Sequence, residues 1–133
     1  MAAVILLVDD SATHRSLVKV FLSGYDLTFL EAENGLRALE IVERTQVHLA
    51  IVDLNMPEMD GITFVRRCRA SARWEMSSLP IVLLTSEKDA TQVAEAVRAG
   101  ADECLRKPVS SAGVLEAVQR ILGTVSPVST GKR

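Results

Sequence analysis

Five short segments with the composition of β-strands, separated by segments of helical periodicity, limit the possible folds more than any other feature of this sequence. The strands are predicted at Val4–Val8, Leu27–Glu31, His48–Asp53, Pro80–Thr85 and Asp102–Arg106. Apolar, β-branched runs of this length are typical of strands that are covered on both faces. Because parallel strands are joined by helical crossovers, the alternation indicates an α/β protein with a doubly wound parallel sheet.

Five helices are predicted from apolar residues at helical spacing. The first begins at a cap formed by Asp10 or Ser11 and ends at Gly24, the second begins at Asn34-Gly35, the third runs from Gly61 to about Ala72, the fourth runs from Ala90 to Gly100, and the last runs from Ser111 to Leu122. The segment Ser71–Leu79 is predicted to be a loop, in which Trp74 is expected to cover apolar side chains.

The polarity of the strands predicts their order in the sheet. Val4–Val8, His48–Asp53 and Pro80–Thr85 are apolar and therefore central, whereas the other two strands have mixed polarity and lie at the edges. The flavodoxin-like order 2-1-3-4-5 satisfies this requirement. The 133 residues suit one domain, predicted over residues 1–123, followed by a flexible tail or the start of a linker over residues 124–133.

Composition and charge exclude several classes of protein. A formal net charge of -2 and a pI near 5.7 lack the basic surface that nucleic-acid binding requires. No apolar run approaches the roughly 20 residues that a membrane-spanning helix needs. Two distant cysteines in a chain without a signal peptide indicate reduced thiols. A cytoplasmic protein is therefore expected, with partners other than nucleic acid or membrane.

Polar residues that can perform chemistry end or follow four of the predicted strands, namely Asp9, Asp10, Asp53, Thr85 and Lys107. In the predicted order, the carboxyl ends of these strands meet at one edge of the sheet. Three carboxylates there call for a cation, and oxygen ligands with no Cys or His expected nearby favour Mg²⁺ over Zn²⁺. Beside such an ion, Asp53 suits a nucleophile toward a phosphoryl group, whose oxygens Lys107 and Thr85 would neutralise.

Five separated features then occur in a fixed order along the chain. They are the pair Asp9-Asp10, Asp53 followed by Met56-Pro57-Glu58-Met59-Asp60-Gly61, Thr85 at the end of the fourth strand, Gly100-Ala101-Asp102, and Lys107-Pro108. Together they resemble the response-regulator receiver family of two-component signalling. The resemblance covers nearly the whole chain, from Val4 to about Leu122.

The resemblance implies a role for each residue of the site. Asp53 would accept phosphate from the phosphohistidine of a histidine kinase or phosphotransfer protein. Mg²⁺ would be bound by Asp10, Asp53 and the backbone carbonyl of Asn55, with Asp9 acting largely through water. Lys107 would contact the phosphoryl group and Thr85 would turn toward it. The family also implies a cis bond between Lys107 and Pro108.

Two positions beside the site bear on the lifetime of the phosphoryl group, and one departure from the family pattern bears on how the signal is transmitted. Asn55 and Glu87 match positions that modulate phosphoryl lifetime in receivers, and they resemble those of single-domain chemotaxis-type regulators. Cys104 stands where the family usually has an aromatic switch residue, and Val109 replaces a frequent Phe. Phosphorylation is expected to work, while the output surface is expected to switch differently. That surface comprises the helix from Ala90, the strand Asp102–Arg106 and the helix from Ser111, and would bind a downstream protein.

Two other functions are compatible with parts of this pattern. An aspartate-nucleophile phosphatase of the haloacid-dehalogenase type also places Asp at a strand end with Mg²⁺, but it needs a second Asp where this chain has Asn55. A pseudo-receiver would keep the fold and signal without phosphate, which Cys104 favours and the intact acidic residues oppose. The leading prediction is a regulator that is no enzyme beyond its own phosphoryl transfer, and a monomer or weak dimer.

Overall fold

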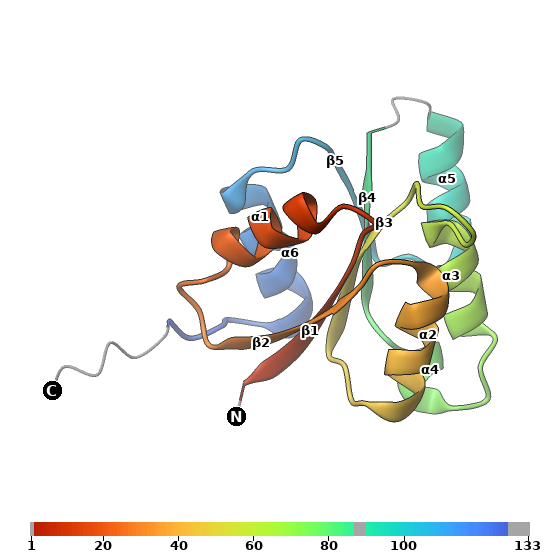
Figure 1. Ribbon diagram of the computed structural model, residues 1–133, viewed down its shortest axis with the longest axis horizontal. Helices are drawn as coiled ribbons and strands as arrows, with labels where there is room; N and C mark the ends of the chain where they lie inside the picture. Colours follow the sequence, from red (N-terminus) through yellow and green to blue (C-terminus); the bar gives the residue numbers. More distant parts are fainter. Residues whose placement is uncertain (1, 87–89, 128–133) are drawn as a thin grey trace, which may run out of the picture.

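The computed structural model describes residues 2–86 and 90–127 and contains one five-stranded sheet with helices on both faces (Figure 1). The strands are β1 (Ala3–Val8), β2 (Leu27–Ala32), β3 (Leu49–Asp53), β4 (Ile81–Thr85) and β5 (Glu103–Arg106). The helices are α1 (Ala12–Phe21), α2 (Gly35–Arg44), α3 (Gly61–Arg69), α4 (Trp74–Ser77), α5 (Ala90–Ala99) and α6 (Ser111–Leu122).

All strand pairs are parallel, and the order β2-β1-β3-β4-β5 confirms the predicted sheet. Every residue of β3 and β4 is buried, whereas β2 and β5 are partly exposed, as their mixed polarity indicated. Figure 1 shows α1 and α6 on one face of the sheet and α2, α3 and α5 on the other. Each face has its own hydrophobic cluster, so the central strands contribute apolar side chains in both directions.

Four helices begin at side chains that cap the free backbone amides of their first turn. Ser11, Asn34, Asp60 and Ser110 each accept a hydrogen bond from the amide three residues later. These caps confirm Ser11 and Asn34 as predicted helix starts. The first and third helices are shorter than predicted and end at Phe21 and Arg69, since turn hydrogen bonds replace the helical pattern beyond those residues.

The predicted loop Ser71–Leu79 contains an additional short helix, α4, so the described residues have six helices rather than five. Its single turn is closed by the Ser78 amide and hydroxyl, which both donate to the Trp74 carbonyl. One turn is too short to produce a periodic pattern in the sequence, which explains why it was missed. The expectation for Trp74 was also wrong, because its side chain is 75% exposed.

The chain beyond α6 returns to the sheet at the beginning of β2. The Asp26 amide donates to the Ser126 carbonyl over 2.8 Å, and Tyr25 pairs with Pro127 in an antiparallel bridge. Val125 packs against the cluster beneath α1 and α6. No helix in the described part of the chain is long and apolar enough to cross a membrane.

Candidate functional site

Three carboxylates gather at the carboxyl ends of β1 and β3. Asp9 and Asp10 follow β1, Asp53 ends β3, and one oxygen of each lies within 4.8 Å of the others. Asp9 and Asp53 are buried, whereas Asp10 is exposed. The parallel pairing of β1 with β3 produces this arrangement, because it aligns Val8 with Val52 and so places the following residues side by side. Oxygen donors so close together form a site suited to a hard divalent cation.

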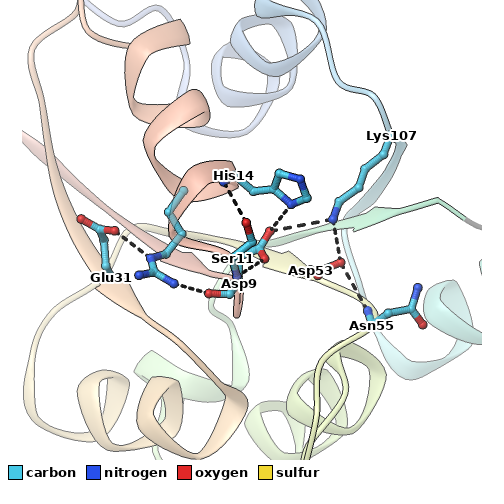
Figure 2. A network of polar contacts seen from close by, with 8 residues as sticks. Asp9, Ser11, His14, Glu31, Asp53, Asn55 and Lys107 are labelled. Atoms are coloured by element: carbon cyan, nitrogen blue, oxygen red, sulfur yellow. Dashed lines mark hydrogen bonds and ion pairs between the residues drawn. The ribbon is translucent and has the colours of Figure 1, made fainter.

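The Asp9 carboxylate is held in place by the start of α1 (Figure 2). Its Oδ1 accepts a hydrogen bond of 2.8 Å from the Ser11 amide, while Ser11 caps the helix by accepting from the His14 amide. The sequence therefore orients the carboxylate locally, through an acidic residue followed by a helix cap. The other oxygen, Oδ2, is turned toward the centre of the site, 3.8 Å from Lys107 Nζ.

Asp53 lies between Lys107 and the chain that follows β3 (Figure 2). Its Oδ1 is 3.1 Å from Lys107 Nζ and also accepts a 3.3 Å hydrogen bond from the Asn55 amide. Lys107 is placed by its own backbone, since its amide donates to the Thr85 carbonyl over 2.7 Å at the end of β4. The bond between Lys107 and Pro108 is cis, as the resemblance implied.

Opposing influences act on the Asp53 carboxyl. Burial raises its pKa most, and the nearby charge of Asp9 raises it further, while Lys107 and the Asn55 amide lower it. The net result is a raised pKa. Without a cation, the cluster therefore disfavours the ionised form of Asp53, and a bound cation would relieve that cost.

The loop after Asp53 is held by buried methionines and a tight turn. Met56 and Met59 are buried against the core, and the Met59 amide donates to the Pro57 carbonyl. Between them Glu58 has φ 71°, in the left-handed region that residues other than glycine seldom adopt. At the end of the loop, the Gly61 amide donates to the Leu54 carbonyl over 2.8 Å. The loop is thus anchored at both ends.

Two residues beside the acidic cluster were not predicted as part of it. The expectation that no histidine lies nearby was wrong, because His14 Nδ1 is 3.5 Å from Asp9 Oδ2. Arg15 donates to the Asp9 backbone carbonyl and forms a 2.7 Å ion pair with Glu31 on β2. The sequence indicates this proximity only through the position of both residues in the first turn after the Ser11 cap. A helix that starts beside the acidic residues places the side chains of its first turn near them.

The remaining predicted residues lie around this centre or outside the described residues. Thr85 is buried at the end of β4, next to Asp53 at the end of β3, because Asp53 pairs with Leu84. Cys104 lies on β5, half-buried against the core beneath α3 and α5. Glu87 lies outside the described residues. The structure thus brings the side chains of Asp9, Asp10, Asp53 and Lys107 together. Thr85 and Asn55 adjoin them through backbone hydrogen bonds, from the Lys107 amide to the Thr85 carbonyl and from the Asn55 amide to Asp53.

Comparison with known proteins identifies the family. The family model for the response regulator receiver domain matches residues 5–119, and the chain therefore belongs to this family. It is 36% identical over 125 residues to a chemotaxis protein CheY homolog of Campylobacter jejuni, covering 92% of this chain and 94% of that protein. It is also 36% identical over 123 residues to chemotaxis protein CheY1 of Helicobacter pylori strain 26695, covering 90% and 97%. The predicted relationship to chemotaxis-type response regulators of two-component signalling is confirmed.

Solved structures agree with this assignment. The chemotaxis response regulator CheY4 of Vibrio cholerae superposes with a TM-score of 0.83 at 30% identity, over 91% of this chain and 99% of that one. The receiver domain of the sensor histidine kinase PA1611 of Pseudomonas aeruginosa has the same fold, with a TM-score of 0.83 at 24% identity over 93% of this chain and 100% of that one. That receiver domain has a magnesium ion coordinated in its active site cleft.

Proposed function

We propose that this response regulator is controlled by phosphorylation of Asp53, with a phosphohistidine of a histidine kinase or phosphotransfer protein as the donor. The observation that carries the proposal is the position of Lys107 Nζ, 3.1 Å from Asp53 Oδ1 and beside the acidic cluster. An ammonium at this distance pairs with one Asp53 oxygen and supplies positive charge for the oxygens of a phosphoryl group. The other Asp53 oxygen remains for the bond to phosphorus.

Mg²⁺ is the proposed cofactor because the donor set fits it. Asp10, Asp53 and the backbone carbonyl of Asn55 would bind the ion, and Asp9 would act largely through water. When bound, the ion offsets the charge of the carboxylates and of the phosphoryl oxygens. The raised pKa of Asp53 supports this assignment, because burial and then the nearby Asp9 carboxylate disfavour the ionised form of Asp53, and a bound cation would offset both effects.

The residues of the chain then divide the work of the transfer. Asp53 forms a bond to phosphorus through a carboxylate oxygen while the bond from phosphorus to the donor imidazole breaks, and the electron pair of that bond stays on the imidazole nitrogen. Lys107 pairs with one phosphoryl oxygen, and the Thr85 hydroxyl turns toward another. Asn55 and Glu87 would modulate how long the phosphoryl group persists.

The proposed output is a protein contact through α5, β5 and α6. Val97 on α5 is 59% exposed and gives this face an apolar side chain that a partner would cover. Cys104 lies on β5 three residues before Lys107, at the position that would report phosphorylation to this face. Because a thiol replaces an aromatic ring, the switch would work by repacking of the β5 surface rather than by rotation of a ring.

The proposal is tested by incubating the protein with phosphoramidate and Mg²⁺ and measuring its intact mass. We expect the mass of one phosphoryl group to appear on the wild type and to be absent when EDTA is added. Beryllofluoride with Mg²⁺ should shift the amide NMR signals around Asp53. Fluorescence is a poor reporter of this event because Trp74, the sole tryptophan, lies at the opposite edge of the sheet.

Asp53→Asn provides the decisive variant and Asp26→Asn its matched control. Both remove one carboxylate charge, but Asp26 is exposed and precedes the amino end of β2, whereas the acidic cluster lies at the carboxyl ends of the parallel strands. Only Asp53→Asn should abolish the added mass. If neither phosphoramidate nor beryllofluoride affects the wild type, a pseudo-receiver is the better description. If Asp53-dependent turnover of a small phosphate ester is found, the phosphatase alternative is correct.

A further inference from the structure

A groove of about 700 Å³ lies at the edge of the sheet opposite the acidic cluster. One wall is formed by the end of α2 and the segment that leads into β3, and the other by α4 and the segment that leads into β4. Figure 1 shows where α2 and α4 lie in the fold. The groove therefore adjoins the amino ends of β3 and β4, whereas Asp53 and Thr85 occupy their carboxyl ends. It shares no residue with the acidic cluster.

The floor of the groove is apolar and one large aromatic side chain stands at its side. Val42 and Leu79 are buried beneath it, with Val47 and Pro80 partly exposed. Trp74 is 75% exposed, more than any other large apolar residue that is exposed in the described part of the chain. An exposed indole beside an apolar floor, within a polar rim, is the arrangement found at the centre of protein-binding surfaces.

The rim of the groove carries more positive than negative charge, although the chain as a whole is acidic. Arg44 and Arg73 lie on opposite walls, and Glu75 is the one carboxylate among the residues that line the groove. Glu75 approaches Arg73 at 3.8 Å, and Arg73 also donates to the Glu43 carbonyl. Arg44 is exposed and has no ion pair or side-chain hydrogen bond among residues 2–86 and 90–127, so its guanidinium is available to a ligand.

From this combination we infer that the groove binds an acidic peptide segment of a partner protein that also carries aliphatic side chains. The carboxylates would pair with Arg44 and Arg73, for which guanidinium groups are well suited. The aliphatic side chains would cover Val42, Leu79 and the Trp74 indole. This surface is separate from the α5, β5 and α6 face, and binding to it requires no phosphorylation of Asp53.

Trp74 is the sole tryptophan, so its fluorescence reports directly on this groove. The probe is a short peptide of alternating glutamate and leucine, compared with the same peptide containing glutamine in place of glutamate. We expect a saturable change of Trp74 emission with the acidic peptide and about tenfold weaker binding of the glutamine peptide, since charge-assisted hydrogen bonds are lost. Equal affinity for the two peptides, or no response to either, would overturn the inference.

Two arginines of the same helix provide matched variants. Arg44→Gln and Arg37→Gln remove the same charge from α2, but only Arg44 lines the groove. Arg44→Gln should weaken binding of the acidic peptide about fivefold or more, and Arg37→Gln should leave it unchanged. Glu75→Gln should strengthen binding, because it removes the carboxylate that competes for Arg73.

A second copy of the chain is the main competing occupant. In that case Trp74 emission would depend on protein concentration without any peptide, and sedimentation would show a dimer that Trp74→Ala abolishes. That result would overturn the inference, as would an Arg44→Gln variant that binds the acidic peptide as well as the wild type does.

Discussion

Substitution of Gly61 by alanine should destabilise the protein strongly, because the backbone of the site leaves no room for a β-carbon. A β-carbon at position 61 would lie 2.9 Å from the Asp53 carbonyl oxygen, 2.9 Å from the Leu54 α-carbon and 2.9 Å from Leu83 Cδ2. Two of these three atoms belong to the backbone, and the Gly61 amide also donates a hydrogen bond to the Leu54 carbonyl. Relief of the overlap must therefore move the chain that carries Asp53.

The size of the effect follows from the cost of overpacking a core. Such insertions cost typically about 1–3 kcal/mol, and contact with backbone rather than flexible side chains places Gly61→Ala near the upper end, at about 3 kcal/mol. With a urea dependence of about 2 kcal/mol/M, the midpoint of unfolding should fall by about 1.5 M. The measurement is urea unfolding followed by circular dichroism.

Two other glycines serve as controls for the change from glycine to alanine. A β-carbon at Gly35 would meet Met59 Cγ and Sδ at 2.9 Å and Met59 Cβ at 3.0 Å but no backbone atom, so Gly35→Ala should cost less than Gly61→Ala. Gly24 has no atom within 4 Å of the added carbon, so Gly24→Ala should be neutral or slightly stabilising. The reasoning is refuted if Gly61→Ala unfolds within about 0.5 kcal/mol of the wild type, or if Gly35→Ala costs as much.

Two further predictions concern the titratable groups. Asp53→Asn should stabilise the protein in metal-free buffer, and the gain in free energy of unfolding should grow with pH. Because the pKa of Asp53 is raised in the folded state, the stability of the wild type falls as pH rises from the ordinary carboxyl range through that pKa. Above that pKa the stability levels off. Urea midpoints of both proteins across this range check it, and a pH-independent difference would contradict it. A thiol reagent at mildly alkaline pH should label Cys104 before Cys68, because Cys68 is fully buried and burial raises its pKa to about 12, whereas Cys104 is half-buried. Mass spectrometry of Cys104→Ser should then show no label without denaturant; rapid labelling of Cys68 in the native protein would be the contrary result.

Much of the fold was predictable because its signals are local. Strand polarity distinguishes strands with two covered faces from those at the edges, and among doubly wound orders the observed β2-β1-β3-β4-β5 fits that division. Helix caps such as Ser11 and Asn34 act within one turn and are visible in the sequence for the same reason. The short helix α4 was not predictable, because one turn has no periodicity and is closed by bonds of its own.

The candidate site was predictable to the level of its members but not of its distances. Asp9 and Lys107 each follow a strand and Asp53 ends one, and parallel strands end at the same edge. The structure adds that Lys107 lies nearer to Asp53, at 3.1 Å, than to Asp9, at 3.8 Å. It also places His14 beside Asp9, although no metal-ligand spacing in the sequence marks that histidine.

The sequence alone therefore determined the doubly wound sheet and the acidic edge where Asp53 lies, because alternation, polarity and strand-end residues are properties of neighbouring positions. Only the tertiary structure decided which side chains meet there at bonding distance, and that the end of α2 and α4 form a groove with Trp74 at its side. These contacts join segments that are distant in the chain, and their geometry depends on how whole helices pack against the sheet.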